Sequence, residues 1–99
     1  MLVHAAALRV ELRILDAHSL KEKRGTLKPI IAELRRRFGV SVAEVDHQDL
    51  WRRATLGIAV VAPQAGQLQR LAHSLEKYFE QLDAVMLLEM AISYLEEPS

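Results

Sequence analysis

The chain has no cysteine and no asparagine among its 99 residues, few aromatic side chains and no net charge. Without cysteine it can form neither a disulfide nor a Cys-ligated metal site, which fits a reducing compartment. No apolar run approaches the roughly twenty residues that span a bilayer. No basic segment precedes the apolar start of the chain. We therefore expect a mature cytoplasmic protein with no membrane partner.

The residues that are present are typical of one folded domain covering residues 1–99. About half of them are apolar and about a quarter are charged, as in ordinary globular proteins. A chain of this length can bury a core without metal or disulfide. The missing asparagine, with nine Arg against four Lys, is typical either of a heat-adapted source or of a biased genome.

The charges are segregated along the chain although they sum to zero. Residues 21–53 carry nine of the thirteen Lys and Arg against five acids, a net charge of about +4. Residues 76–97 carry six acids against Lys77 alone. Like charges gathered on one surface indicate a partner of opposite charge.

Hydrophobic periodicity predicts six elements in the order β-α-β-β-α-β. Alternating apolar and charged residues predict a first strand through Leu8–Ile14. A capping box of Ser19 and Glu22 begins a helix, and Gly39 ends it. Either the helix kinks at Pro29, or the main helix starts near Thr26 with Pro29 in its first turn. We favour one kinked helix, because the apolar face keeps its phase on both sides of Pro29. The remaining strands and helix are predicted at Val40–Val45, Thr55–Val61, Gln64–Leu82 and Val85–Leu95.

This order predicts an α+β ferredoxin-like sandwich, with an antiparallel sheet of strand order 4-1-3-2 and two helices on one face. Its open sheet face and the edge strand 85–95 are the surfaces through which we expect a homo-oligomer. The expected apolar face of the first helix is Leu20, Leu27, Ile31, Leu34 and Phe38. The expected inward set of the last strand is Met86, Leu88, Met90, Ile92 and Tyr94, with Val85 and Leu87 outward.

A basic stripe follows the first helix beside its apolar face. At 100° per residue its members lie within an arc of about 60°, and they extend about 21 Å along the axis. Such a ladder of cations can follow a phosphate backbone. The alternative is a solvated flank whose long side chains cover the edge of the core. The stripe consists of Lys21, Arg24, Lys28 and Arg35.

Two further basic clusters are candidates for binding nucleic acid. One occupies the last turn of the helix, where cations complement the helix dipole, although three cations exceed that need. The other places the only Trp beside two guanidinium groups, a combination used in single-stranded RNA binding. The alternative there is a Trp that caps the core beside solvated arginines. The two clusters are Arg35, Arg36 and Arg37, and Trp51, Arg52 and Arg53.

Motifs for catalysis or metal binding are missing. The four glycines form no phosphate loop, and the His and Asp residues match neither a zinc signature nor a catalytic triad. An enzyme would have to use Asp46, His47 and Asp49, which no motif supports. We expect no cofactor and no metal.

Three strings, together with Ala54, resemble the YlxP-like family of small bacterial proteins, a domain of unknown function. The strings are HSLKEKR at 18–24, FGVSVAE at 38–44 and DHQDLW at 46–51. The resemblance covers nearly the whole chain and implies a ferredoxin-like fold without an established activity. The family's gene often lies near those for translation initiation factor two and ribosome-binding factor A, which implies by association an RNA or ribosome partner. The family's recurring residues, none with an assigned chemical role, correspond to Ser19, Lys21, Lys23, Arg24, Ser41, Glu44, Asp49 and Trp51.

The leading hypothesis is therefore a non-catalytic RNA- or ribosome-associated module. Its basic stripe, the arginines of the helix end and the two arginines after Trp51 would contact phosphate, and Trp51 would stack or anchor. The alternative is an oligomeric small-ligand or protein-interaction domain with no nucleic-acid role, in which the stripe is only a solvated flank.

Overall fold

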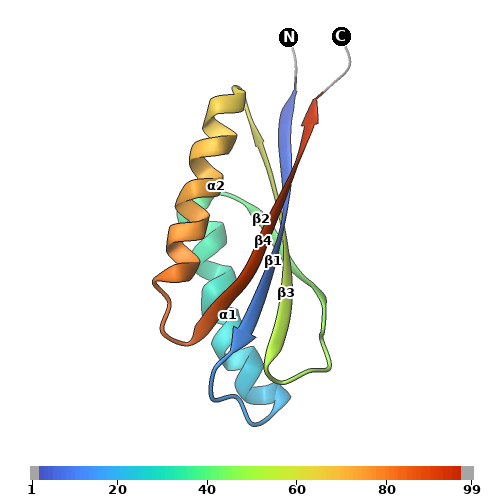
Figure 1. The fold of residues 1–99 in the computed structure, drawn as a ribbon, viewed down its shortest axis with the longest axis vertical. Helices are drawn as coiled ribbons and strands as arrows, with labels where there is room; N and C mark the ends of the chain where they lie inside the picture. Colours follow the sequence, from blue (N-terminus) through green and yellow to red (C-terminus); the bar gives the residue numbers. More distant parts are fainter. Residues whose placement is uncertain (1–2, 97–99) are drawn as a thin grey trace.

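The computed structural model describes residues 3–96, and its elements follow the predicted β-α-β-β-α-β order. Both helices lie on one side of a single sheet (Figure 1). The strand order is β2-β3-β1-β4 and all neighbours are antiparallel. The ferredoxin-like prediction is confirmed. The elements are β1 (His4–Ile14), α1 (Leu20–Phe38), β2 (Ser41–Asp46), β3 (Arg53–Ala62), α2 (Ala65–Glu80) and β4 (Val85–Glu96).

The ends of α1 lie where the sequence predicts, although only one of the two hydrogen bonds of the capping box forms within residues 3–96. The Ser19 hydroxyl accepts a hydrogen bond of 3.0 Å from the Glu22 amide, which satisfies one of the unpaired amides of the first turn. Gly39 ends the helix with φ at 63°, and its amide donates to the Arg35 carbonyl. Glycine takes this left-handed conformation without steric cost. The helix continues through Pro29, and its apolar face is buried both before and after the proline.

The core fills the space between the helices and the inner face of the sheet. β1 and β3 are the central strands, so their inward residues are the most deeply buried. Fully or almost fully buried apolar side chains include Val10, Leu12, Ile14, Leu34, Leu56, Leu75 and Phe79.

Among residues 3–96, no helix is long and apolar enough to cross a membrane.

A bulge changes the register of β4. Glu11 of β1 pairs with Glu89, but the next residue, Leu12, pairs with Leu87. One extra residue of β4, Leu88, therefore stands between these two pairs. Such a bulge reverses the alternation of side chains on one side of it.

The prediction for the first half of β4 is consequently wrong. Val85 and Leu87 pack toward the core, whereas Met86 and Leu88 are exposed. Beyond the bulge, Met90 and Ile92 pack against the core as predicted, whereas Tyr94, also predicted inward, is exposed. A strict period of two cannot reveal an inserted residue inside a strand, because every residue from Val85 to Met90 except Glu89 is apolar.

Candidate functional site

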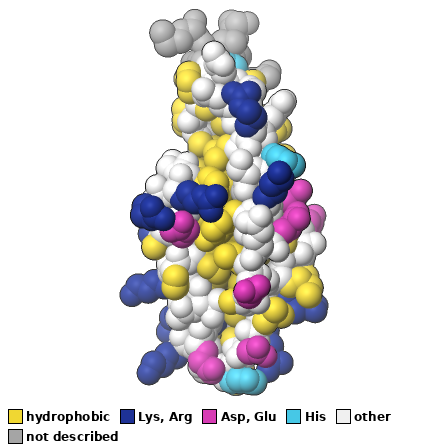
Figure 2. All heavy atoms as spheres, turned by 90° about the vertical axis from the view of Figure 1, so that its left-hand side faces the viewer, with side chains coloured by type: hydrophobic (Ala, Val, Ile, Leu, Met, Phe, Trp, Pro, Cys, Tyr) yellow, Lys and Arg dark blue, Asp and Glu magenta, His cyan; other side chains and the backbone are white. Residues whose placement is uncertain are grey.

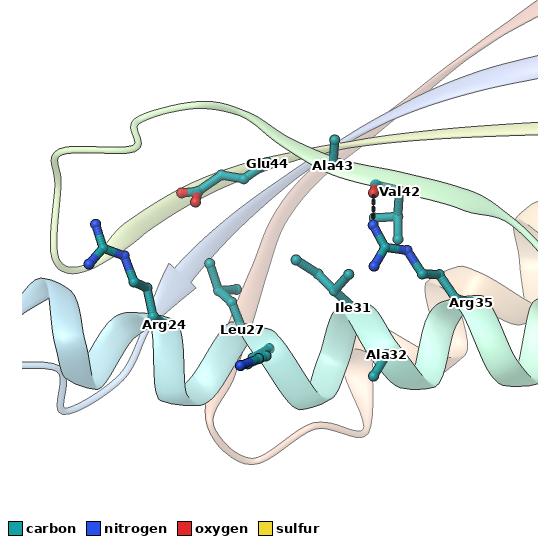
Figure 3. Close-up of a pocket in the computed structure, with 9 residues that line it drawn as sticks. Arg24, Leu27, Ile31, Ala32, Arg35, Val42, Ala43 and Glu44 are labelled. Atoms are coloured by element: carbon teal, nitrogen blue, oxygen red, sulfur yellow. Dashed lines mark hydrogen bonds between the residues drawn. The ribbon is translucent and has the colours of Figure 1, made fainter.

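A groove of about 590 Å³ separates α1 from β2, one of the two outer strands of the sheet. Figure 3 shows two apolar side chains pointing from α1 toward β2, with an arginine at each end of the row. Three members of the predicted basic stripe therefore border one apolar surface. We call Arg24, Lys28 and Arg35 the groove cations, and Leu27, Ile31 and Val42 the groove floor.

No groove cation forms an ion pair with an acid within residues 3–96. Arg35 donates from Nη2 to the Val42 carbonyl at 3.0 Å, which fixes its position across the groove (Figure 3). Arg24 and Lys28 are exposed, as is Lys21. These three make no hydrogen bond or ion pair within residues 3–96. Uncompensated cations in a row attract anionic partners.

Arg36 and Arg37 lie outside the groove and have local partners. Arg36 donates from Nη2 to both carboxylate oxygens of Glu33, at 2.8 and 2.7 Å. The Arg37 guanidinium lies 5.1 Å from the ring centroid of Phe38 and 5.8 Å from that of Tyr78. Figure 2 shows Lys and Arg side chains on both margins of a hydrophobic band on the helical side. Because Arg36 and Arg37 contact different partners, they do not form one basic surface with Arg35 at the helix end. Phosphate contact by Arg36 and Arg37 stays a prediction.

The loop between β2 and β3 presents Trp51 to solvent. About half of this residue (51%) is exposed, so the alternative in which it caps the core is wrong. It borders an open hollow of about 540 Å³ formed by residues 49–53. Arg52 instead braces the loop, because its Nε donates to the Ala17 carbonyl at 3.0 Å. Arg53, in β3, lies 3.6 Å from the Glu11 carboxylate.

Sequence reasoning missed Lys23, which lies in the core with only 1% of its surface exposed. Its Nζ lies 2.7 Å from Glu44 Oε2 and donates to the His47 carbonyl at 2.7 Å. A buried ammonium group is costly unless it is paired and hydrogen-bonded. Lys23 thereby ties α1 both to β2 and to the loop that carries Trp51.

His47 has a backbone conformation that needs such support. Its φ is 62°, in the left-handed region that a non-glycine residue seldom adopts. Its carbonyl accepts from Lys23 and also from the Leu50 amide at 3.0 Å. The loop is therefore held by its main chain, while Trp51 remains exposed.

The polar network continues to the open face of the sheet through Thr55. His47 Nδ1 lies 3.2 Å from Thr55 Oγ1, which donates to the buried Glu11 carboxylate at 2.8 Å. This hydrogen bond is the largest influence on Glu11 and lowers its pKa. Burial opposes it, and the hydrogen bond and charge of Arg9, 3.1 Å away, lower the pKa further. One chain of contacts thus joins α1, the loop and both central strands.

The helical spacing of α1 and the alternation of β2 each indicated one member of the buried pair Lys23 and Glu44. At 100° per residue, Lys23 falls about 20° from Leu34 and about 40° from Leu27, inside the buried arc of α1. Glu44 follows buried Val42 by two residues and so has the inward phase of β2. A lysine and a glutamate on facing apolar phases indicate a buried ion pair. Within residues 3–96, no group of three or more His, Asp or Glu side chains is placed to hold a metal ion.

These features define a small ferredoxin-like α+β domain with a basic groove beside an edge strand and an aromatic loop anchored by a buried lysine. The chain belongs to the family described as "Protein of unknown function (DUF503)", whose profile matches residues 5–92. It is similar to the uncharacterized protein YlxP of Bacillus subtilis (strain 168), with 44% identity over 57 residues. That match covers 58% of this chain and 62% of the relative, less than two thirds of its length.

Proposed function

We propose that this protein is a non-catalytic module that binds RNA, free or within the ribosome, along the groove between α1 and β2. The observation that carries the proposal is the row of groove cations, none of which is bonded to an acid within residues 3–96. Trp51 supports it with an exposed ring on a loop that Lys23 ties to the same helix.

The spacing of the groove cations suits a chain of phosphates. Arg24 and Arg35 are eleven residues apart, which is about 16 Å along a helix, and Lys28 lies between them. Each phosphate contact releases counterions, so the logarithm of the affinity falls linearly with the logarithm of the salt concentration. The Lys23 ammonium and the His47 carbonyl are occupied by contacts that hold the fold, which supports a binding role over catalysis.

The test is binding of the purified protein to labelled RNA and to ribosomal subunits across a salt series. The variant Arg24→Glu with Lys28→Glu reverses two groove cations. Its matched control is Arg70→Glu with Lys77→Glu, an equal charge change on exposed residues of α2. We expect only the groove variant to weaken binding and to lower the salt slope by about 1.4, or about 0.7 per phosphate contact on a single strand.

The melting temperature checks that both double variants remain folded. Unchanged RNA binding by the groove variant would contradict the proposal. Equal weakening by both variants would also contradict it, because the binding would then depend on total charge and not on the groove.

Self-association is a second candidate, favoured by the sheet face that the helices leave uncovered. On this face Gly57 and Ala59 pair with Ala43 and Ser41 of β2, and Ala59 pairs with Ala7 of β1, so small side chains cover the part of the face around Ala59. Val61 is exposed over 70% of its surface at the same end. Apolar residues on both faces of a strand are typical of a sheet covered on both sides.

A further inference from the structure

The groove contains two features that contact with phosphate does not require. Its floor is apolar, with Leu27 and Ile31 pointing toward β2 (Figure 3). Its wall includes the carboxylate of Glu44, which would repel a phosphate placed beside it. A surface that only follows a phosphate backbone needs neither feature.

Glu44 has one carboxylate oxygen committed and the other available. Oε2 lies 2.7 Å from Lys23 Nζ, whereas Oε1 makes no hydrogen bond within residues 3–96. The side chain is about a quarter exposed (23%) and lines the groove. The buried Lys23 thus holds in place, at the wall of the groove, a carboxylate whose second oxygen has no partner within residues 3–96. A carboxylate accepts well from the amino group of cytosine, whereas uracil presents a carbonyl at the equivalent position.

We infer that the groove takes an unpaired base of single-stranded RNA and favours a base with an amino group. The base lies over Leu27 and Ile31 and donates to Glu44 Oε1, while its flanking phosphates contact the groove cations. Trp51 stacks a neighbouring base of the same strand. This inference rests on the proposed function and specifies the form of RNA that is bound.

Two observations favour this ligand over its competitors. The bases of a duplex are stacked and paired, so they cannot reach the floor of a groove beside a helix. An extended acidic peptide would add to the outer edge of β2 through main-chain hydrogen bonds. The Val42 carbonyl already accepts from Arg35 across the groove, so part of the main chain of β2 is occupied by a side chain of this protein.

The experiment measures fluorescence anisotropy with labelled RNA of about twelve nucleotides. The probes are oligocytidine, oligouridine and a fully paired duplex of mixed sequence. We expect the single strands to bind more tightly than the duplex. We also expect oligocytidine to bind about tenfold more tightly than oligouridine, because one hydrogen bond to a charged acceptor changes an affinity by about that factor. Polyglutamate serves as the peptide-like competitor.

Two variants test the two features separately. Ile31→Ala removes part of the floor without changing charge, and its control, Leu71→Ala, removes an apolar side chain that also packs at the edge of the core. Only Ile31→Ala should reduce the preference for single strands. Glu44→Gln should abolish the preference for cytidine over uridine. A circular dichroism melt confirms that each variant is folded, and Ile31→Ala tests the inference even if Glu44→Gln does not fold.

The outcomes separate this inference from the proposed function. Salt-dependent RNA binding that the reversal of Arg24 and Lys28 weakens, but with equal affinity for duplex and single strand, would overturn the inference and leave the proposed function standing. Displacement of RNA by polyglutamate at equal charge concentration would overturn it as well. A failure to bind any RNA would overturn both.

Discussion

The pairing of Lys23 with Glu44 leads to a sharp prediction about stability. We consider three variants: Lys23→Met, Glu44→Leu and the double variant that carries both changes. Each replacement is apolar and of similar length, so the main change is the loss of a charge. The ammonium group is almost completely buried, whereas the carboxylate is about a quarter exposed.

This difference in burial determines the expected magnitudes. Glu44→Leu leaves the Lys23 charge buried with only the His47 carbonyl as partner, so the free energy of unfolding should fall by about 3 kcal/mol. Lys23→Met leaves a carboxylate that water can reach, and the loss should be about 1.5 kcal/mol. The double variant leaves no unpaired charge, so its free energy of unfolding should fall by about 1.5 kcal/mol. This loss is about 3 kcal/mol smaller than the sum of the losses of the two single variants.

The assay is urea unfolding followed by circular dichroism, with acrylamide quenching of fluorescence as a second readout. Trp51 is the only tryptophan, so quenching reports on the loop alone. Lys23→Met removes the donor to the His47 carbonyl, and quenching should rise. The double variant should regain stability relative to Glu44→Leu but keep the raised quenching, because methionine cannot donate.

Two results would refute this reasoning. If the stability losses of the single variants add in the double variant, the two charges are not coupled and the 2.7 Å contact contributes nothing. If Lys23→Met is destabilised but Trp51 is quenched as in the unchanged protein, the lysine does not hold the loop.

Two further predictions concern the sheet. The pKa of Glu11 is lowered, chiefly by the hydrogen bond from Thr55, so its stabilising contribution is present above the ordinary value of 4.5 and is lost as pH falls through the lower folded value. Thr55→Val should lower the free energy of unfolding near neutral pH. It should also make the decrease in that free energy between neutral pH and about pH 3 smaller. Urea midpoints at both pH values check this. Light scattering should show a mass above the monomer that Val61→Lys reduces, and a monomer at every concentration would contradict self-association through this face.

Most of the fold could be predicted because local signals agreed with one another. The capping box at Ser19 and the glycine at the helix end specify where α1 begins and ends, and alternation specifies the inward side of β1. The register of β4 could not be predicted, since the bulge depends on pairing with Glu11 and Leu12 across the sheet. Such a long-range event leaves no mark in a strand whose residues are nearly all apolar.

The candidate site was predictable in its charges but not in its contacts. The arc of Arg24, Lys28 and Arg35 follows from helical spacing, whereas the groove exists only because β2 lies beside α1. Lys23 was not predicted to be buried, because charged residues are usually solvated. Its position on the helix nevertheless places it on the same face as the buried leucines. Phase is therefore a better guide than residue type where two apolar faces each carry one charge of opposite sign.

The topology also explains how a chain without net charge would present cations to the anionic ligand that we propose. β2 and β4 are the two outer strands, with α1 packed against β2 and α2 against β4. The groove cations of α1 and the acids Glu76, Glu80, Asp83 and Glu89 thus lie on or beside elements at opposite edges of the sheet. At physiological salt the Debye length is about 8 Å, while the principal extents across the molecule are 23 and 21 Å. The acids of one edge are screened from a ligand at the other, so we expect the proposed affinity for RNA to depend on the few cations that touch the ligand.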